Sequence, residues 1–357
     1  MPGARAARHS DAVHGAGAAR DRTAPQFGVG TTDDGAHGSI VILEGVRVAV
    51  TGGAGFIGVH TVEALLDGGA DVVVIDDLRH ASSRRLPDHV ALVEADVAGA
   101  EAREAVKRFG AEAVVHLAAQ GGVNRSWREP VEDARANVLG TLSMLLAAVD
   151  AGCRRFVFAS SGGALYGSTD RLPTPETEAA APLSPYGTAK LVAETYLEMF
   201  TRTRGLSACA LRYGNVYGPG QDGTGEAGLI AISCRRLLAG SAPLIRGDGL
   251  QTRDFVFVGD VVRANLLALD SSATEPVNIG TGVQTPVNAV VAELMAAAAV
   301  QARPERVPAP AGEVRRCCLD NARARALLGW SPNHALSDGL SRTYRAFAGA
   351  ASVPAVS

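Results

Sequence analysis

The sequence predicts an α/β protein with a doubly wound, parallel sheet. Apolar runs of strand length recur along the first half of the chain, helical stretches separate them, and the runs are continuously apolar rather than alternating. A strand that is apolar on both faces belongs to a sheet covered on both sides, which is the usual environment of parallel strands. We therefore expect strand–helix–strand units wound onto both faces of one sheet.

The regular part of the chain begins near Val46. The predicted strands cover residues 46–50, 72–75, 90–93, 113–115, 156–158 and 208–211, and the clearest helices cover 57–66, 131–149 and 186–200. Residues 1–44 lack any periodicity, so we expect a disordered leader there. We divide the remainder into a sheet domain at 45–212, a smaller C-terminal α/β lobe at 213–348 with some segments that return to the sheet, and a frayed tail at 349–357.

Composition excludes several classes of protein. The 357 residues carry 34 basic and 37 acidic side chains, so a net charge of -3 gives no electrostatic reason for a nucleic-acid or anionic-membrane partner. No apolar run reaches the roughly 20 residues that span a bilayer, and the N-terminus lacks the apolar core of a signal peptide. Five cysteines form no CxxC pair, and His116 has no second ligand at metal-binding spacing. We expect a cytoplasmic protein with free thiols and no metal site.

A glycine-rich turn, TGGAGFIG at residues 51–58, lies between the first strand and the first helix. Gly52, Gly55 and Gly58 allow a pyrophosphate to approach backbone N–H groups and the positive end of the helix. Asp76 ends the second strand, where a carboxylate accepts hydrogen bonds from ribose hydroxyls and repels a 2′-phosphate. This order of strand, glycines, helix and acid predicts a dinucleotide site that prefers NAD to NADP.

The acids near this site have alternative interpretations. Asp77 directly follows Asp76, so Asp76 can instead begin a turn. Asp96 follows the third predicted strand and either borders an adenine ring or caps a helix, and the sequence favours neither.

Tyr186 and Lys190 lie four residues apart at the start of a predicted helix, so their side chains share one face. A free phenol titrates at about 10, and a nearby ammonium favours the phenolate, so we expect Lys190 to bring the pKa of Tyr186 toward neutrality for acid–base catalysis. Only Lys107 and Lys190 among the 34 basic residues are lysines. The use of lysine at position 190, in a chain whose other basic residues are nearly all arginine, indicates that the ammonium itself is required. The alternative is a surface lysine one turn from a packed tyrosine.

Long motifs along nearly 300 residues carry a family resemblance. The chain resembles the extended short-chain dehydrogenases/reductases, and most closely the NAD-dependent nucleotide-sugar 4-epimerases of the UDP-glucose 4-epimerase type. The resemblance implies a Rossmann domain, a sugar-nucleotide lobe, and a homodimer formed through the helices at 131–149 and 186–200. The motifs that carry it are TGGAGFIG (51–58), HLAAQ (116–120), NVLGT (137–141), SSGGALYG (160–167), SPYGTAK (184–190), RYGNVYGPGQD (212–222), GEAG (225–228), GDGLQTRDFV (247–256), NIGTG (278–282) and LGW (328–330).

The resemblance also implies a catalytic group. Tyr186 is the expected acid/base on the sugar 4-hydroxyl, Lys190 its electrostatic partner, and a Ser or Thr after the fifth strand completes the proton path. Counting from the strand places Ser161 there, whereas counting back from Tyr166 places Gly162 there; we favour Ser161. In the alternative interpretation, Ser160 and Ser161 only satisfy backbone groups.

The resemblance assigns residues to the two ligands. The implied cofactor is NAD, held by Gly52, Gly55, Phe56, Ile57, Gly58, Asp76, Asp77, Asp96, Val97, Leu117, Ala118, Ala119, Gln120, Asn137, Ser160, Tyr186 and Lys190. The implied UDP-sugar residues are Ser161, Gly162, Tyr186, Asn215, Gly228, Leu229, Arg253, Glu313 and Arg315.

Two departures bear on substrate binding. Many relatives have an arginine where this chain has Pro310, so Arg315, Arg316 or Arg246 is expected to contact phosphate instead. The resemblance implies that Arg253 pairs with the diphosphate; the alternative is that Arg253 forms a purely structural ion pair with Asp254. Relatives that take glucuronate can place an arginine near Asp222; Asp222 disfavours that substrate, although Arg125 and Arg128 remain as substitutes.

The expected reaction is epimerisation at C4 of a UDP-hexose through a transient 4-keto intermediate, with the substrate being of the glucose/galactose, N-acetylhexosamine or hexuronate type. Dehydration is disfavoured because Gly162 and Gly163 stand where dehydrating relatives carry an acidic pair. One rival is a UDP-uronate decarboxylase or another C4-oxidising enzyme. A rival of another class is a non-catalytic NAD-binding sensor.

Overall fold

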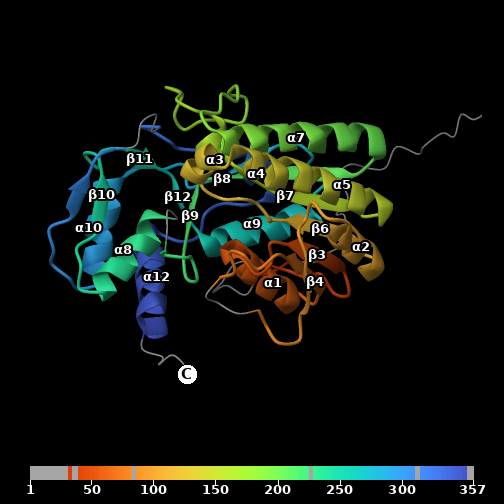
Figure 1. Ribbon diagram of the computed structural model, residues 1–357, viewed down its shortest axis with the longest axis horizontal. Helices are drawn as coiled ribbons and strands as arrows, with labels where there is room; N and C mark the ends of the chain where they lie inside the picture. The colour runs from red at the N-terminus through yellow and green to blue at the C-terminus, as the bar shows by residue number, and fades with distance from the viewer. Residues whose placement is uncertain (1–30, 34–38, 83–85, 225–227, 310–313, 352–357) are drawn as a thin grey trace, which may run out of the picture.

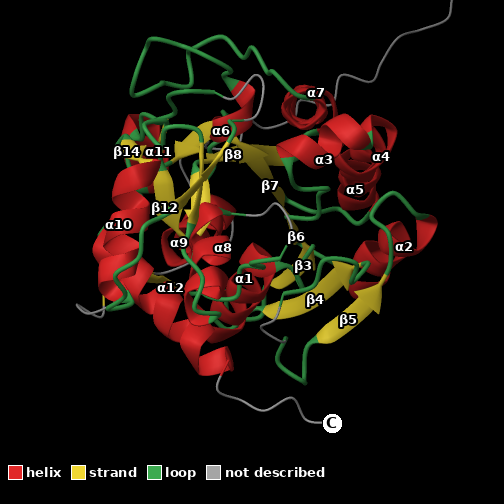
Figure 2. Cartoon of the chain, turned by 60° about the vertical axis from the view of Figure 1, so that its left-hand side comes forward, coloured by secondary structure: helices red, strands yellow, loops and turns green. Residues whose placement is uncertain are grey.

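The computed structural model describes residues 31–33, 39–82, 86–224, 228–309 and 314–351. At its centre lies a seven-stranded sheet in which all neighbouring strands are parallel, so the predicted fold class is confirmed (Figure 2). Its strands, in spatial order, are β13 (Val277–Ile279), β8 (Ser207–Tyr213), β7 (Arg155–Ser161), β6 (Ala113–His116), β3 (Arg47–Thr51), β4 (Asp71–Asp76) and β5 (Ala91–Glu94).

The strand order reverses between β3 and β6. From β3 the chain first builds outward through β4 and β5, and then returns to add β6, β7 and β8 on the other side. In open parallel sheets, ligands bind in the crevice at the carboxyl ends of the strands, where such a reversal occurs. The topology therefore places the expected site beyond Thr51 and His116, the last residues of β3 and β6.

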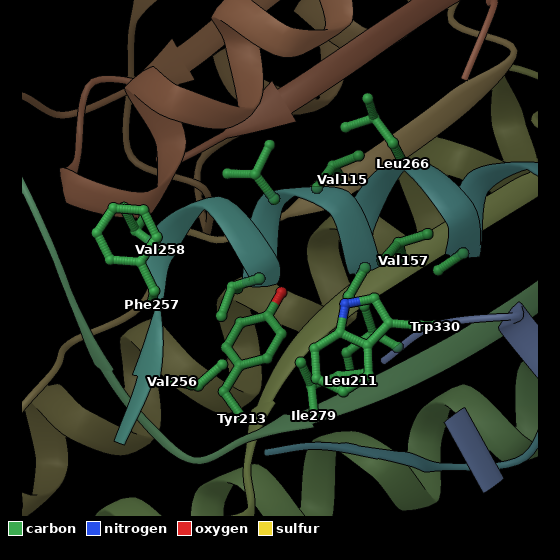
Figure 3. Close-up of a cluster of buried hydrophobic side chains, with 14 of the residues drawn as sticks. Val115, Val157, Leu211, Tyr213, Val256, Phe257, Val258, Leu266, Ile279 and Trp330 are labelled. Carbon is green, nitrogen blue, oxygen red and sulfur yellow. The ribbon is translucent and has the colours of Figure 1, made fainter. Parts of the chain in front are cut away.

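Helices cover both faces of the sheet. On one face lie α1 (Phe56–Asp67) and α9 (Val258–Asp270), which pack against each other, and on the other lie α2 (Ala100–Phe109), α5 (Gly140–Asp150) and α7 (Pro185–Arg204). In β3, Val48 and Val50 belong to the core of the first face and Ala49 to the core of the second. This alternation explains why the strands are continuously apolar. Figure 3 shows the first core, where Trp330 and Leu211 pack beside α9.

The segment predicted as one helix at 131–149 has three parts. A short helix, α3 (Val123–Arg128), precedes α4 (Pro130–Ala134), which continues through a π-helical turn, η1 (Arg135–Leu139), into α5. The predicted helix is therefore continuous, but its middle is a π-helical turn that the sequence pattern does not indicate. A Cβ at Gly140 would lie 2.8 Å from Val97 Cγ2, so Gly140 lets the helix approach the turn that follows β5 closely.

The C-terminal lobe is built from short pairs of strands (Figure 1, left). These are the parallel pairs β9 (Asn215–Tyr217) with β12 (Phe255–Phe257) and β10 (Leu244–Arg246) with β15 (Glu305–Val307), and the antiparallel pair β11 (Thr252–Arg253) with β14 (Thr285–Pro286). The helices of this region and the remaining short helix are α8 (Leu229–Leu238), α10 (Val287–Ala297), α11 (Ala322–Leu328), α12 (Leu336–Ala351) and α6 (Gly162–Leu165). Through β13 and α9, the chain returns from this lobe to the central sheet.

The end of the predicted leader is ordered. β1 (Thr31–Asp33) and β2 (Ser39–Val41) form an antiparallel pair, and Val41 and Leu43 are buried in the first core. The predicted boundary at residue 44 is wrong for this part, because Val41 and Leu43 are buried although the leader as a whole is polar. At the other end, α12 continues to Ala351, two residues beyond 349, where the tail was expected to begin. Residues 1–30 and 352–357 lie outside the described part of the chain.

Among the residues that the structure describes, no helix combines the length and the apolar character needed to cross a bilayer.

Candidate active site

The glycine-rich turn between β3 and α1 forms a backbone cradle. Gly52 has φ +68°, and a Cβ there would lie 2.5 Å from the Ala118 backbone nitrogen. A Cβ at Gly58 would lie 2.1 Å from the Gly52 carbonyl oxygen. The N-cap of α1, Gly55, provides no side-chain cap. The turn therefore needs glycine for its conformation and packing, and it presents backbone N–H groups at the positive end of α1.

A cavity opens directly beside this cradle at the carboxyl ends of β3, β4 and β6. Residues predicted to bind the cofactor that line it are Gly52, Gly55, Asp76, Asp77, Asp96, Val97, Leu117, Ala118, Ala119 and Gln120. The remaining lining residues were not predicted: Arg79, His80, Ala95, Arg125, Glu132 and Ala136. Arg79 and His80 follow the Asp76–Asp77 pair after one residue, a position that could have indicated them. Arg125 and Glu132 come from helices α3 and α4, whose approach to the crevice is a tertiary feature.

Other predicted cofactor residues lie around the cavity rather than among its lining residues. Phe56, Ile57 and Gly58 form the first turn of α1. Asn137 is buried in η1, where its side-chain amide donates to the Gln120 carbonyl at 3.1 Å. The Ser160 hydroxyl donates to buried Glu194 at 2.5 Å and therefore points into the core.

Asp76 is held rigidly at the end of β4. Its Oδ2 accepts from the Ala54 backbone and its Oδ1 from the Leu78 backbone, each at 2.9 Å. Burial raises the pKa of this carboxyl, although the two backbone N–H groups partly oppose the shift. Each carboxylate oxygen has a second lone pair, so Asp76 can still accept from a ribose hydroxyl.

Asp96 lies at the cavity and also stabilises a turn. It lines the cavity, and its Oδ1 accepts from the Ala98 backbone at 2.9 Å in the turn before α2. The N-cap of α2 is Gly99, so Asp96 stabilises the turn without capping the helix itself. Its Oδ2 lies 2.5 Å from Arg135 Nη1, and its pKa is lowered: burial opposes this, but the hydrogen bonds from Arg135 and Ala98 prevail.

Helix α7 carries the expected catalytic pair. Ser184 caps it by accepting from the Gly187 backbone at 3.1 Å, and Pro185 occupies the first helical position. Tyr186 follows in the first turn, and Lys190 lies one turn further on, with its Nζ 5.7 Å from the centre of the Tyr186 ring. The cap therefore fixes where the pair begins on the helix.

Lys190 is almost completely buried, with 2% of its surface exposed. Its Nζ donates to the Ala159 carbonyl of β7 at 2.8 Å and lies 4.6 Å from the centre of the Phe158 ring. Burial lowers the pKa of Lys190 to about 8, while Asp133 and Glu194 oppose the shift. The ammonium is thus held against β7, the strand that ends at Ser161.

Tyr186 lies close enough to Ser161, the last residue of β7, for the Ser161 side chain to influence its pKa. Burial raises the pKa of Tyr186 to about 12, and Ser161 partly opposes this. In the chain by itself, desolvation of the phenolate outweighs the influence of the neighbouring groups on this pKa. That Lys190 brings the pKa of Tyr186 toward neutrality stays a prediction.

The loop after Ser161 is packed and carries no acid. A Cβ at Gly162 would lie 2.6 Å from Leu319 Cδ1, and a Cβ at Gly163 would lie 3.6 Å from Asn215 Oδ1. Gly162 therefore provides close packing, and Gly163 faces the predicted substrate residue Asn215.

A second cavity lies in the C-terminal lobe. It is lined by the predicted residues Asn215, Gly228, Leu229 and Arg253, together with Arg246, Gln251, Phe255 and residues of α3, β9 and α8. Two guanidinium groups, Arg246 and Arg253, thus face one cavity, which suits an anion such as a diphosphate.

The other predicted anion-binding residues lie elsewhere. Arg315 forms a bidentate ion pair with Asp248, with both distances 3.0 Å, and Arg316 pairs with Asp170. Neither is among the residues that line this cavity. Glu313 lies outside the described residues.

The sheet order relates the two cavities. Ser161 ends β7, which lies between β6, whose end borders the first cavity, and β8, which is followed by Asn215 of the second. The Gly52 and Gly58 cradle, the unblocked start of α1 and Asp76 fit a dinucleotide pyrophosphate and ribose. With the Tyr186–Lys190 pair, the fold and site define an extended short-chain dehydrogenase/reductase.

Known proteins of this class resemble the chain over most of its length. Residues 48–280 match the model of the NAD dependent epimerase/dehydratase family. A UDP-glucose 4-epimerase of Mycolicibacterium smegmatis is 41% identical over 308 residues, 85% of this chain and 98% of the relative. A putative UDP-glucose 4-epimerase of Methanocaldococcus jannaschii is 41% identical over 83% of this chain and 96% of the relative.

Solved structures agree. The UDP-glucose 4-epimerase of Thermotoga maritima with UDP-glucose superposes with a TM-score of 0.82 at 42% identity, over 86% of this chain and 100% of that one. That of Thermus thermophilus with NAD superposes with a TM-score of 0.81 at 38% identity, over 85% and 100%. The chain belongs to the NAD-dependent epimerase/dehydratase family, and its cofactor is NAD.

Proposed function

We propose that this protein catalyses epimerisation at C4 of a UDP-hexose, with UDP-glucose and UDP-galactose as the first pair to test. The observation that carries the proposal is the Tyr186–Lys190 pair, in which Lys190 is buried and Tyr186 lies beside Ser161, between the dinucleotide cavity and the cavity of Asn215 and Arg253. Relatives named UDP-glucose 4-epimerase support this reading at 41% identity.

The residues divide the chemistry between them. Tyr186 removes the proton of the sugar 4-hydroxyl and later returns it, with Ser161 beside the phenol. Lys190 stabilises the phenolate as an ammonium. When bound, NAD⁺ supplies an acceptor and donor for the C4 hydrogen and a positive charge that favours the phenolate. Arg253 anchors the diphosphate, so the 4-keto sugar can turn over and be reduced on its other face without leaving.

The loop after β7 argues against loss of water. Elimination requires an acid that protonates the leaving hydroxyl, and Gly162 and Gly163 provide none. For a uronate, Arg125 is an unsuitable carboxylate partner, because it lines the dinucleotide cavity and donates to Glu129 at 2.9 Å.

Incubation of the purified protein with UDP-glucose, UDP-N-acetylglucosamine and UDP-glucuronate tests the proposal. We expect a C4 epimer of unchanged mass from at least one of them, detected by NMR and mass spectrometry, and NAD released on denaturation. Loss of CO₂ from UDP-glucuronate would instead show a decarboxylase. Bound NAD without turnover of any sugar nucleotide would favour a sensor.

The proposal includes a homodimer. Large apolar side chains are exposed over α3, α4, η1 and the approach to α7: Val131 is 77% exposed, Trp127 64% and Leu139 55%. They line one apolar hollow together with Leu183 and Val192 (helices grouped at the right of Figure 2). A second copy, meeting the same helices by two-fold symmetry, would cover this face.

Sedimentation equilibrium tests the dimer. We expect twice the chain mass for the wild type and monomer for Val131→Glu, while Leu327→Glu, a change at an exposed leucine of α11, leaves the dimer intact. A monomeric wild type at micromolar concentration would contradict it. We also place the protein in the cytoplasm, a location that suits its five buried free thiols.

A further inference from the structure

The catalytic ammonium lies in the protein interior without a direct ion pair. Lys190 Nζ has the Ala159 carbonyl and the faces of two aromatic rings as neighbours. Within the described ranges, no carboxylate oxygen lies within 4.0 Å of it. A buried ammonium that lacks a compensating charge loses its proton, because burial favours the neutral amine.

Several titratable or charged groups face Lys190 from the elements around it. Tyr186 and Glu194 lie on α7, His116 on β6, and Asp133 on α4. His116 is fully buried, with its pKa lowered to about 3 by burial and by Lys190, so it is neutral. Tyr186 is neutral as well, since its pKa is about 12. Two carboxylates therefore remain as sources of negative charge.

Glu194 is already neutralised. Arg212 of β8 donates to it through Nη2 at 2.6 Å and through Nε at 3.0 and 3.2 Å, and Ser160 donates at 2.5 Å. Glu194 and Arg212 are both buried, so the pair contributes one negative and one positive charge to the same region. The two charges largely cancel, so Glu194, which also raises the pKa of Lys190, is not a dedicated counter-charge for it.

Asp133 has no such cation. Its side chain is fully buried on α4, which packs against α7. Among the described residues, the one group that hydrogen-bonds to this carboxylate is the Asn137 amide, which donates to Oδ1 at 3.0 Å. Asp133 Oδ2, Asn137 Oδ1 and Gln120 Nε2 are buried atoms without partners among the described residues. An ionised carboxylate in this setting requires a nearby positive charge.

We propose that Asp133 is a positioning residue that acts through Lys190, as the counter-charge that keeps this side chain an ammonium in a buried site. The catalytic use of that ammonium rests on the proposed function, but the charge pair itself does not. Each group favours the charged form of the other: Asp133 raises the pKa of Lys190, and Lys190 lowers that of Asp133. Burial is the larger influence on each, so the pKa of Asp133 stays above its usual value and that of Lys190 below it. Asp133 also raises the pKa of Tyr186, so its charge acts on the whole catalytic pair.

The rarity of lysine makes a direct measurement possible. In protein labelled with ¹³C at lysine Cε, Lys107 and Lys190 give two NMR signals, and Lys107→Arg assigns them. We expect Asp133→Asn in the NAD-bound protein to lower the pKa of the Lys190 signal by about one unit, the effect of removing one nearby charge. Asp133→Glu keeps the charge and should leave this pKa close to that of the wild type.

The matched control is Glu198→Gln, which removes one negative charge from the exposed side of the same helix α7. It should not move the Lys190 signal. A Lys190 pKa that is the same in Asp133→Asn and in the wild type would overturn the proposal. If Asp133→Asn does not fold, Asp133→Ser is measured against the same expectation, since it leaves room for water in place of the carboxylate.

The titration needs no turnover, so it separates this proposal from the proposed function. If the enzyme acts on a sugar nucleotide, the alkaline limb of kcat, where Lys190 loses its proton, should move to lower pH in Asp133→Asn by the same amount. A lower amplitude with an unmoved limb would indicate a merely structural role and would contradict the proposal.

Discussion

The two cavities at the carboxyl edge of the sheet are built by different means. The dinucleotide cavity is bounded by backbone: Gly52 and Gly58 bring chain segments into contact where no Cβ fits, and the start of α1 faces the crevice. The substrate cavity instead depends on long side chains from short strands, above all Arg246 and Arg253. The first is therefore sensitive to an added carbon atom, and the second to a lost charge.

The Tyr186–Lys190 pair lies between the two cavities, so a change to it should lower turnover and leave ligand binding unchanged. We expect Tyr186→Phe to reduce kcat by about a thousandfold, the usual loss for a general acid/base, with NAD still bound. Tyr196→Phe, on the same helix, is the control and should retain activity. Steady-state kinetics and NAD content decide this, and near-normal turnover would remove Tyr186 from the mechanism.

The backbone cradle can be broken with one methyl group. Gly52→Ala adds a Cβ that would lie 2.5 Å from the Ala118 backbone at a positive φ, so we expect NAD affinity to fall about a hundredfold. Gly45→Ala is the matched control, since Gly45 also has φ +68° but no atom lies within 4 Å of its Cβ position. UDP affinity should be unchanged in both. Equal NAD binding by the two variants would contradict the steric argument.

The substrate cavity can be broken by removing charge. Arg253→Gln should weaken UDP binding by about thirtyfold, the value of a charge-assisted hydrogen bond, while NAD content stays the same. Arg315→Gln should have no effect, because Arg315 is occupied by Asp248. Calorimetric titration with UDP measures both. A larger loss for Arg315→Gln would place the phosphates elsewhere.

The smallest effect concerns the stability of the sheet half. Burial lowers the pKa of His116 from 6.5 to about 3. Between these two pH values the unfolded chain binds more protons than the folded chain, so the free energy of unfolding falls as the pH decreases. Between pH 7 and 5.5, His116 should contribute a loss of about 1 kcal/mol. Urea unfolding of His116→Gln should show a correspondingly weaker pH dependence, and exposed His89→Gln the wild-type one. An equal pH dependence in His116→Gln would contradict a buried neutral histidine.

The sheet half was largely predictable from the sequence because its signals are local. Continuous apolar runs predict buried strands, the glycines predict the turn, and the spacing of Tyr186 and Lys190 defines one helix face. The π turn at Arg135–Leu139 was not predictable, since the apolar pattern does not distinguish a π-helical turn from an α-helical one. The raised pKa of Tyr186 was not predictable either, because it results from burial, which is a tertiary property.

The substrate half and Asp133 illustrate the limit of local signals. Strands of two or three residues, such as Thr252–Arg253, are too short to leave a periodic pattern. Whether Arg246, Arg315 or Arg316 faces the ligand depends on where Asp248 and Asp170 lie. Within α4, Glu132 and Asp133 look alike in sequence. Only the i, i+4 spacing of Asp133, Asn137 and Thr141, which are linked by hydrogen bonds, indicates the buried face.

The central claim is that one sugar carbon loses its hydrogen and regains it on the opposite face. The most direct test is conversion of UDP-glucose, or another UDP-hexose that the protein accepts, in D₂O with NMR of the product. We predict the C4 epimer with protium retained at C4, because only the hydroxyl proton passes through Tyr186 and exchanges with solvent. Deuterium at C4, or a product of different mass, would contradict the account.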